Sequence, residues 1–176
     1  MNKTKQLAAI LLLLLSACAL LQSEYERVSF ALDPGWKVGN MSEIPRQISV
    51  TEFIREGDNI KAWKELFTVQ TIGRHGGSPS SPEEWIDRLK AVSEKDCPGV
   101  KKWNVIARDE TSILYEWQAK PCLGWPDQHE IARIILGKYN SFHLRYTAKV
   151  YHVPPEQRHK WIRKFSDATI ATSPRK

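Results

Sequence analysis

The amino-acid sequence predicts an α+β fold, with a largely antiparallel β-sheet flanked by two main helices. Hydrophobic residues recur with a period of two along most of the chain, which is typical of strands that alternate between the faces of a sheet. Helical periodicity interrupts this pattern twice, once in the middle and once near the C-terminus. The connections between the later strands are shorter than the roughly dozen residues of a parallel crossover, so their pairing is predicted to be antiparallel.

Length and composition favour a single globular domain. The chain has 176 residues, of which 41% are hydrophobic, 10% aromatic and 26% charged. These proportions exclude wholesale disorder and a collagen-like structure. The length suits one domain with an ordinary hydrophobic core.

Residues 1–17 are typical of a secretory signal peptide. Lys3 and Lys5 give a positive start, and residues 7–15 form an apolar run that is too short to cross a bilayer as a permanent helix. A buried core helix is the alternative, but an apolar run directly after two lysines disfavours it.

The end of this segment, Leu15-Ser16-Ala17-Cys18, resembles the lipobox of bacterial lipoproteins. The resemblance implies that Cys18 is diacylated, becomes the first mature residue and usually gains a third chain on its amine. Two or three acyl chains hold a protein on a membrane, at about 0.8 kcal/mol per buried methylene. Ala19 stands where an aspartate would favour the inner membrane, so the resemblance favours the periplasmic face of the outer membrane.

The net charge of the full chain, +6, would suggest a nucleic-acid or membrane partner. Part of this charge belongs to the predicted signal peptide. Without residues 1–17 the chain loses Lys3 and Lys5 and no acid, which leaves a net charge of +4. This charge is spread along the chain, and an exported protein does not meet nucleic acid. We therefore expect no nucleic-acid partner.

Residues 18–26 are predicted to form a lipidated tether, residues 27–172 the single α+β domain, and residues 173–176 a tail. The domain opens with Val28, Phe30 and Leu32 on one face of a first strand, followed by the turn residues Asp33-Pro34-Gly35-Trp36. Three strands are predicted in this part of the chain, at residues 27–32, 47–55 and 63–72.

A helix is predicted to begin at Pro82 and to end near Cys97. Ser81 has the position of an N-cap, proline suits the first helical position, and Glu84 completes a capping box. One apolar face follows at helical spacing. Its residues are Trp85, Leu89 and Val92.

Four further strands and a closing helix complete the domain. The strands are predicted at residues 103–108, 112–119, 129–136 and 142–151, with a hairpin turn at residues 137–140. Pro154-Pro155-Glu156 begins the last helix, in which Trp161, Phe165 and Ala168 form the apolar face.

This layout resembles the PsbP-like group, which includes the DcrB-type bacterial lipoproteins. The residues that carry the resemblance are the Asp33-Pro34-Gly35-Trp36 turn, the helix start Ser81-Pro82-Glu83-Glu84-Trp85 and the closing helix with Trp161. It covers most of residues 27–170. It implies a PsbP-like α/β sandwich with a binding or assembly role, and it carries over no catalytic site and no cofactor.

Cys97 and Cys122 remain once Cys18 is lipidated. An exported, oxidising compartment favours a disulfide bond between them, which would stabilise the fold by about 3–4 kcal/mol through loop closure. A metal site or a nucleophilic thiol is the alternative. The absence of a CxxC motif and of a nearby histidine disfavours both.

The densest polar cluster surrounds His129. Asp127 and His129 have the residue types of an acid–base pair, and His143 on the adjoining strand is a candidate second metal ligand. A metal site needs three or four convergent ligands, and the histidines show no such spacing. We therefore expect no metal and no catalysis, and treat Trp125, Asp127, His129 and Arg145 as possible ligand or partner contacts.

Charged residues on the predicted strands form a second candidate site. They are Glu52, Glu116, Glu130, Arg133 and Arg145. If they converge on one face of the sheet, they form either a polar pocket for an ionic ligand or a set of cross-strand ion pairs, and the second interpretation is favoured.

Seven tryptophans are present. Trp85, Trp117 and Trp161 fall on apolar faces and are predicted to lie in the core. Trp125 and two others lie beside turn residues, where an aromatic side chain either contacts a partner or plugs the end of the sandwich.

The sequence thus predicts a non-catalytic, lipid-anchored cell-envelope protein. It would bind a protein partner or assist envelope assembly, stress response or secretion, with the membrane held through Cys18 and no cofactor. An immunity or exclusion lipoprotein, and a glycan or small-ligand binder, are the alternatives.

Overall fold

The computed structural model describes residues 24–45, 47–75 and 78–174. The signal peptide and Cys18 lie outside these ranges, so their assignments stay predictions. The elements are β1 (Glu24–Ser29), β2 (Trp36–Ile44), β3 (Ile48–Arg55), β4 (Glu65–Gly73), α2 (Pro82–Asp96), β5 (Lys101–Arg108), β6 (Ser112–Ala119), β7 (Gln128–Leu136), β8 (Asn140–Ala148), α3 (Pro155–Ser166) and β9 (Thr169–Pro174). None of the described helices is long and apolar enough to span a membrane.

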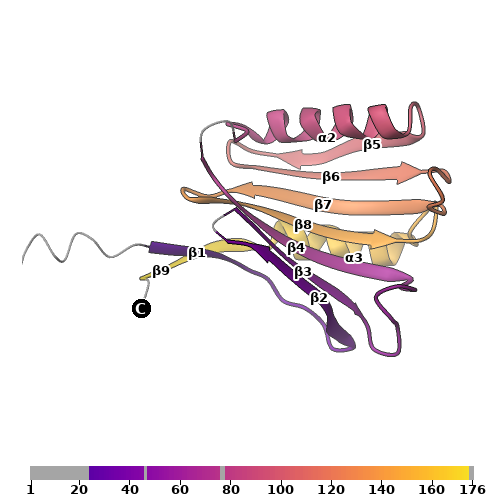
Figure 1. The fold of residues 1–176 in the computed structure, drawn as a ribbon, viewed down its shortest axis with the longest axis horizontal. Coiled ribbons are helices and arrows are strands. Elements are labelled where there is room, and N and C mark those ends of the chain that lie inside the picture. The colour runs from indigo at the N-terminus through magenta and orange to yellow at the C-terminus, as the bar shows by residue number, and fades with distance from the viewer. Residues whose placement is uncertain (1–23, 46, 76–77, 175–176) are drawn as a thin grey trace, which may run out of the picture.

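The fold is α+β, as the sequence predicts. Seven strands form one antiparallel sheet in the order β2-β3-β4-β8-β7-β6-β5, and β1 pairs with β9 in a separate ribbon that projects at one end of the molecule (Figure 1). Every pairing is antiparallel, because short hairpins join most neighbouring strands.

The sheet carries a helix on each face. Trp161 and Phe165 of α3 pack on one face of strands β4, β6, β7 and β8, where Phe67, Leu144 and Tyr146 are buried. Ile86 of α2 packs on the other face of β6 and β7. Because neighbouring residues of a strand point to opposite faces, the middle of the sheet is buried on both sides.

Helix α2 begins as its sequence predicts. Ser81 Oγ accepts a hydrogen bond from the backbone N–H of Glu84 (3.2 Å), and proline follows the cap. The carboxylate of Glu84 reaches back one residue further than in a standard capping box, to the N–H of Ser80 (2.7 Å). The first contact satisfies a backbone donor that the first turn leaves free, and the second fixes the residue before the cap.

The predicted boundaries between the domain and its two ends are wrong, because residues assigned to the tether and to the tail belong to strands. β1 begins at Glu24 and β9 runs to Pro174, and the two pair in register, with Glu26 opposite Thr172. Glu26 is buried, and its carboxylate accepts backbone hydrogen bonds from Lys138, Tyr139 and Asn140 (2.7–2.9 Å). A residue assigned to a polar tether therefore fixes the β7–β8 hairpin.

β2 is a strand that the sequence analysis did not predict. It forms one edge of the sheet, and its register with β3 shifts between Val38 and Asn40. Most of its side chains are exposed, including Met41 at 70%. An exposed edge strand needs no hydrophobic alternation, so the periodicity that marks the other strands is missing here.

Candidate functional site

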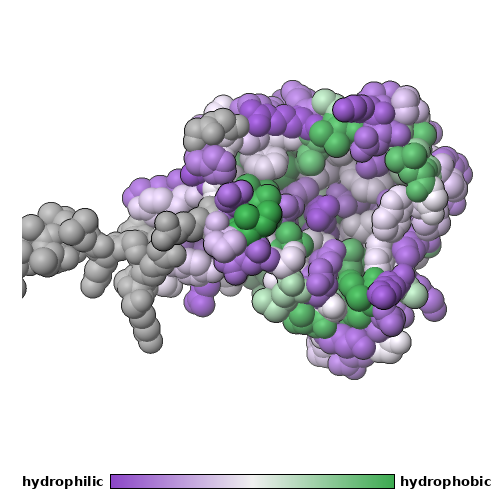
Figure 2. Space-filling view, viewed as in Figure 1, coloured by the Kyte–Doolittle hydropathy of each residue, from purple (hydrophilic) through white to green (hydrophobic). Residues whose placement is uncertain are grey.

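A groove lies between α2 and the sheet, with a volume of about 470 Å³. Figure 2 shows this face hollowed between α2 and the strands below it, with hydrophilic side chains in the middle and hydrophobic ones at the edges. We call it the α2 groove. Its aromatic lining comprises Trp63, Trp103, Tyr115, Trp117 and Trp125, and its polar lining includes Thr68, Lys101, Glu130, His143 and Arg145.

Arg145 lies in the middle of the groove floor. It belongs to β8, the central strand, and stands in register with Thr68 on β4 and Ala132 on β7. Both neighbours are small, so the guanidinium has room above the sheet. Its Nε is buried and has no hydrogen-bond partner, and among the described residues no carboxylate forms an ion pair with it.

Lys101 supplies a second positive charge at the groove. Its Nζ lies 4.1 Å from the centre of the Trp117 ring, a cation–π contact. Burial lowers the pKa of Lys101, the charges of Glu130 and Asp96 oppose this effect, and the charge of Arg145 adds to it. The two cations are thus close enough to repel each other.

Glu130 is the buried acid of the groove, and its oxygens are occupied. Trp117 Nε1 donates to Oε1 (2.8 Å) and Thr147 Oγ1 donates to Oε2 (3.0 Å). Glu52, near the edge of the sheet, accepts a hydrogen bond from Asn40 (3.0 Å). Within the described part of the chain, neither acid forms an ion pair with Arg145.

His143 and Tyr115 form a buried pair beside Arg145. A hydrogen bond of 2.8 Å joins the Tyr115 hydroxyl to His143 Nε2. Burial, aided by the charge of Arg145, lowers the pKa of His143 well below its usual value, and burial raises the pKa of Tyr115. Both groups therefore stay neutral near pH 7 and position the groove floor rather than exchange protons.

His129 lies on the opposite face of the sheet, so the predicted grouping of His129 with Arg145 is wrong. Its Nδ1 accepts the backbone N–H of Val153 (2.9 Å), which leaves Nε2–H to donate to Glu116 (3.2 Å). The side chain is 1% exposed, and burial lowers its pKa despite the Glu116 contact. It is a neutral structural residue under α3.

Glu116 is the centre of this second network. Arg158 donates from Nε and Nη2 to its two oxygens (2.7 and 2.8 Å), and Asn104 donates as well (2.9 Å). Burial alone would raise the pKa of Glu116, but the hydrogen bonds from Arg158, Asn104 and His129 prevail and lower it to about 2.

Trp125 and Asp127 lie on the β6–β7 loop, and Trp125 lines the rim of the groove. Cys122 and Trp125 exchange backbone hydrogen bonds (2.9 and 3.1 Å), and the tight turn between them places Leu123 and Gly124 at positive φ. Trp125 is 54% exposed and Leu123 is 74% exposed. Asp127 lies 4.0 Å from Lys120 Nζ and half-exposed, outside the groove.

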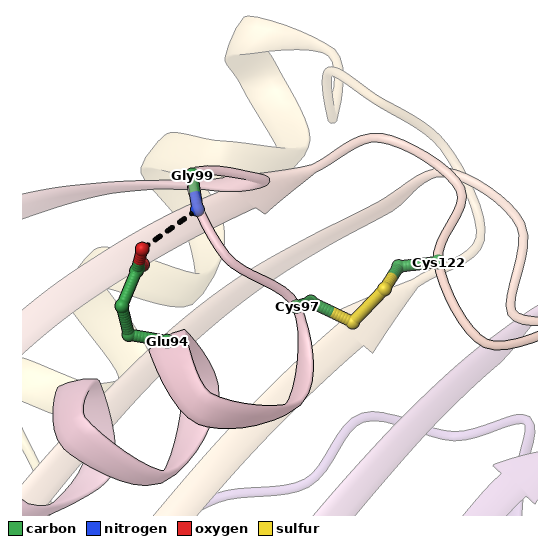
Figure 3. The surroundings of a disulfide bond; sticks show 4 residues. All are labelled: Glu94, Cys97, Gly99 and Cys122. Carbon is green, nitrogen blue, oxygen red and sulfur yellow. Dashed lines mark hydrogen bonds between the residues drawn. A yellow bond between two sulfur atoms is a disulfide. The ribbon is translucent and has the colours of Figure 1, made fainter.

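A disulfide bond joins Cys97 to Cys122, the pair that the sequence favours (Figure 3). It links the C-terminal end of α2 to the rim loop. Beside it, the carboxylate of Glu94 accepts a hydrogen bond from the N–H of Gly99 (2.9 Å), which fixes the turn after the helix. Both walls at this end of the groove are therefore held in place.

The charged cluster predicted on one sheet face is divided between two. Glu52, Glu130 and Arg145 line the α2 groove. Glu116 lies under α3, and Arg133 donates to the carbonyls of Phe165, Ser166 and Ala168 at the end of α3 (2.6–3.1 Å). His129 and His143 likewise face opposite sides, and within the described residues no group of three potential metal ligands exists.

Lys101 and Thr68 are groove residues that the sequence analysis did not select. Trp103 and Lys101 alternate along β5 and point to the same face as Tyr115 and Trp117 of β6. The two-residue spacing of Lys101 and Trp103 is visible in the sequence. Only the pairing of β5 with β6 shows that they share a face with Tyr115 and Trp117.

Known proteins give little further guidance. No family model matches the chain, and no curated protein matches it. Among solved structures, a mutant of protein Mog1 has a TM-score of 0.44 and 14% identity over 81% of this chain and 84% of that one. The Ran-binding protein Mog1p of Saccharomyces cerevisiae gives 0.44 and 13% over the same shares. These likenesses are too weak to assign a family or a function.

Proposed function

We propose that this protein is a non-catalytic binding protein whose α2 groove receives a segment of a protein partner. The observation that carries the proposal is the unpaired Arg145 in the middle of a groove lined with aromatic rings. Tryptophan, tyrosine and arginine are the residues that most often dominate binding at protein interfaces.

The rim of the groove supports a macromolecular partner. Leu123 and Trp125 extend the apolar lining onto the outer surface, and Val92 of α2 is also exposed at the groove. A ligand confined to the groove would leave these side chains in water, whereas a polypeptide that runs over the rim would cover them.

The rigidity of the groove also favours binding. The disulfide between Cys97 and Cys122 fixes the end of α2 against the rim loop. A preformed site loses less conformational entropy on binding than one that must be ordered by its ligand. The buried Tyr115–His143 pair supports a role without acid–base chemistry, since neither group titrates near neutral pH.

The resemblance of residues 15–18 to a lipobox supports an anchored position in the cell envelope, facing the periplasm. The expected partner is then an envelope protein or a protein that passes through the envelope. A small ligand is the second candidate, because about 470 Å³ lies within the usual range of roughly 300–1,000 Å³ for small-molecule pockets.

Site-specific photocrosslinking in intact cells tests the proposal. Benzoylphenylalanine at position 123, on the rim, should give a discrete protein adduct, and the same group at position 163, exposed on α3, should not. The Trp125→Ala change should weaken the adduct at position 123 several-fold. Equal adducts from both positions, or none at position 123, would contradict a protein partner at this groove.

A further inference from the structure

We propose that Arg145 and Lys101 form a carboxylate-binding site in the α2 groove, and that the carboxylate belongs to the partner segment, next to an aromatic or aliphatic side chain. This inference rests on the proposed function and specifies its ligand chemistry.

The first argument is the cost of an unpaired arginine at this position. Arg145 stands on the central strand, and its Nε–H is buried without an acceptor. A buried donor without a partner, and a half-buried charge without a counter-ion, each reduce the stability of the folded state. An anionic ligand that accepts from the terminal N–H groups would supply the missing counter-ion.

The second argument is that, among the residues the structure describes, no group accepts from the Arg145 Nε–H and no acid forms an ion pair with this side chain. Glu130 on the adjoining strand accepts hydrogen bonds from Trp117 and Thr147 and forms no ion pair with Arg145 among the described residues. Glu52 is engaged by Asn40. Arg145 is therefore a cation of the groove without an ion-pair partner among the described residues, and a ligand can supply that partner.

The third argument is the presence of Lys101. Its ammonium lies over the Trp117 ring. Burial lowers its pKa, the charges of Glu130 and Asp96 raise it, and the charge of Arg145 lowers it further. Two cations that repel each other across a groove attract an anion between them more strongly than either does alone, and partial burial reduces screening by salt.

The donors fit an anion with two oxygens, and an unmodified polypeptide partner offers such an anion only as a carboxylate. The terminal N–H groups of the guanidinium form a planar fork, which matches two oxygens of a carboxylate or of a phosphate. The surrounding rings of Trp103, Tyr115 and Trp117 favour an apolar group beside the charge. The ligand chemistry is thus an acidic side chain or a chain terminus flanked by an apolar residue.

Three matched peptides test this inference with the purified full-length protein. The probes are N-acetyl-Trp-Glu-Leu-amide, N-acetyl-Trp-Gln-Leu with a free C-terminal carboxylate, and the neutral N-acetyl-Trp-Gln-Leu-amide. Binding is followed by NMR through the Nε–H resonance of Arg145. We expect at least one acidic peptide to bind roughly ten-fold more tightly than the neutral one and to shift this resonance.

Two variants and their controls assign the effect to the site. Arg145→Gln and Lys101→Gln should each reduce the preference for the acidic peptides. Lys102→Gln, the next residue of β5 but on the opposite face, and Arg163→Gln on α3 should leave it unchanged. Which acidic peptide binds identifies the source of the carboxylate, a side chain or a chain terminus.

Other results overturn the inference in distinguishable ways. Equal binding of all three peptides shows that no carboxylate is recognised, and inorganic phosphate that binds more tightly than the acidic peptides shows that the site prefers another anion. If crosslinking at position 123 still succeeds in either case, the groove binds a protein partner by other contacts. If the peptides are discriminated but no protein crosslinks, the proposed partner is wrong and the carboxylate site remains.

Discussion

The two faces of the sheet use the same strands for different purposes. Under α3, aromatic rings pack closely around Phe67 and Trp161, and the charged residues Glu116 and Arg158 are paired. Under α2, the helix covers only part of the sheet, and Arg145 is left without a partner. We infer that the α3 face provides most of the stability and that the α2 face is available for binding.

The helices differ in how they are attached. α3 presents Trp161 and Phe165 to the core, and Arg133 fixes the carbonyl groups at its C-terminal end. α2 buries one large apolar side chain, Ile86, and is secured by the disulfide from Cys97. A covalent link can hold a helix without filling the space beneath it, so the groove remains open.

The largest expected effect comes from removing an aromatic ring on the α3 face. Trp161 is 2% exposed and stacks on Tyr146, with 4.4 Å between the centres of the two rings. Trp161→Ala should lower the free energy of unfolding by about 3–5 kcal/mol, because it leaves a large cavity. Trp125→Ala, at the exposed rim of the α2 groove, should change it by less than about 0.5 kcal/mol. Denaturant unfolding followed by circular dichroism measures both, and equal losses would contradict the division between the faces.

The disulfide should give the next largest effect. Replacing Cys97 and Cys122 by alanine opens a loop with a sequence separation of 25 residues, and should lower the free energy of unfolding by about 3–4 kcal/mol. Hydrogen exchange should accelerate in α2 and the β6–β7 loop and stay unchanged in α3. Reduction of the unmodified protein should reproduce the pattern, whereas faster exchange confined to α3 would refute it.

Much of the fold follows from local patterns in the sequence. The strand predicted at residues 112–119 has the observed bounds, and the Ser81 cap lies where predicted. β2 and β9 were missed for physical reasons: β2 is an exposed edge without alternation, and β9 is a short polar segment. β9 is stabilised by pairing with β1, more than a hundred residues away.

The candidate site was only partly predictable. Arg145 and Trp125 were selected from the sequence and both line the groove. Alternation within one strand shows which of its residues share a face. It does not show which residues of the neighbouring strand lie on that same face, so His129 could not be separated from Arg145 by sequence alone. The register between β7 and β8, with His129 opposite Ala148, decides this. Register is set by long-range pairing, which one sequence does not reveal.

A third prediction concerns the paired charges of the α3 face. Glu116→Gln should lower the free energy of unfolding by about 2 kcal/mol at pH 7, because it weakens the hydrogen bonds from Arg158. The pKa of Glu116 is about 2 in the folded protein and about 4.5 ordinarily. As the pH falls, the unfolded state therefore takes up this proton at a higher pH than the folded state does. The contribution of Glu116 to the free energy of unfolding is complete above about pH 5 and is lost as the pH falls towards 2.

Unfolding experiments at pH 7, 5 and 3 test this dependence. The difference between wild type and Glu116→Gln should shrink at pH 3. Glu110→Gln, in the exposed turn between β5 and β6, serves as the control and should match wild type at each pH. A difference that is constant from pH 7 to pH 3 would show that the carboxylate charge contributes nothing there.

The smallest effect on stability is expected for Arg145, and it distinguishes the two faces most sharply. Arg133→Met should lower the free energy of unfolding by about 1.5–3 kcal/mol, since it removes charged hydrogen bonds to the end of α3. Arg145→Met removes a buried donor that has no acceptor, so we expect a change between zero and a gain of about 1 kcal/mol. Both changes delete one arginine from the sheet, and the measurement is again denaturant unfolding. A loss at Arg145 as large as that at Arg133 would mean that its guanidinium stabilises the fold, and the unpaired charge could then no longer be attributed to binding.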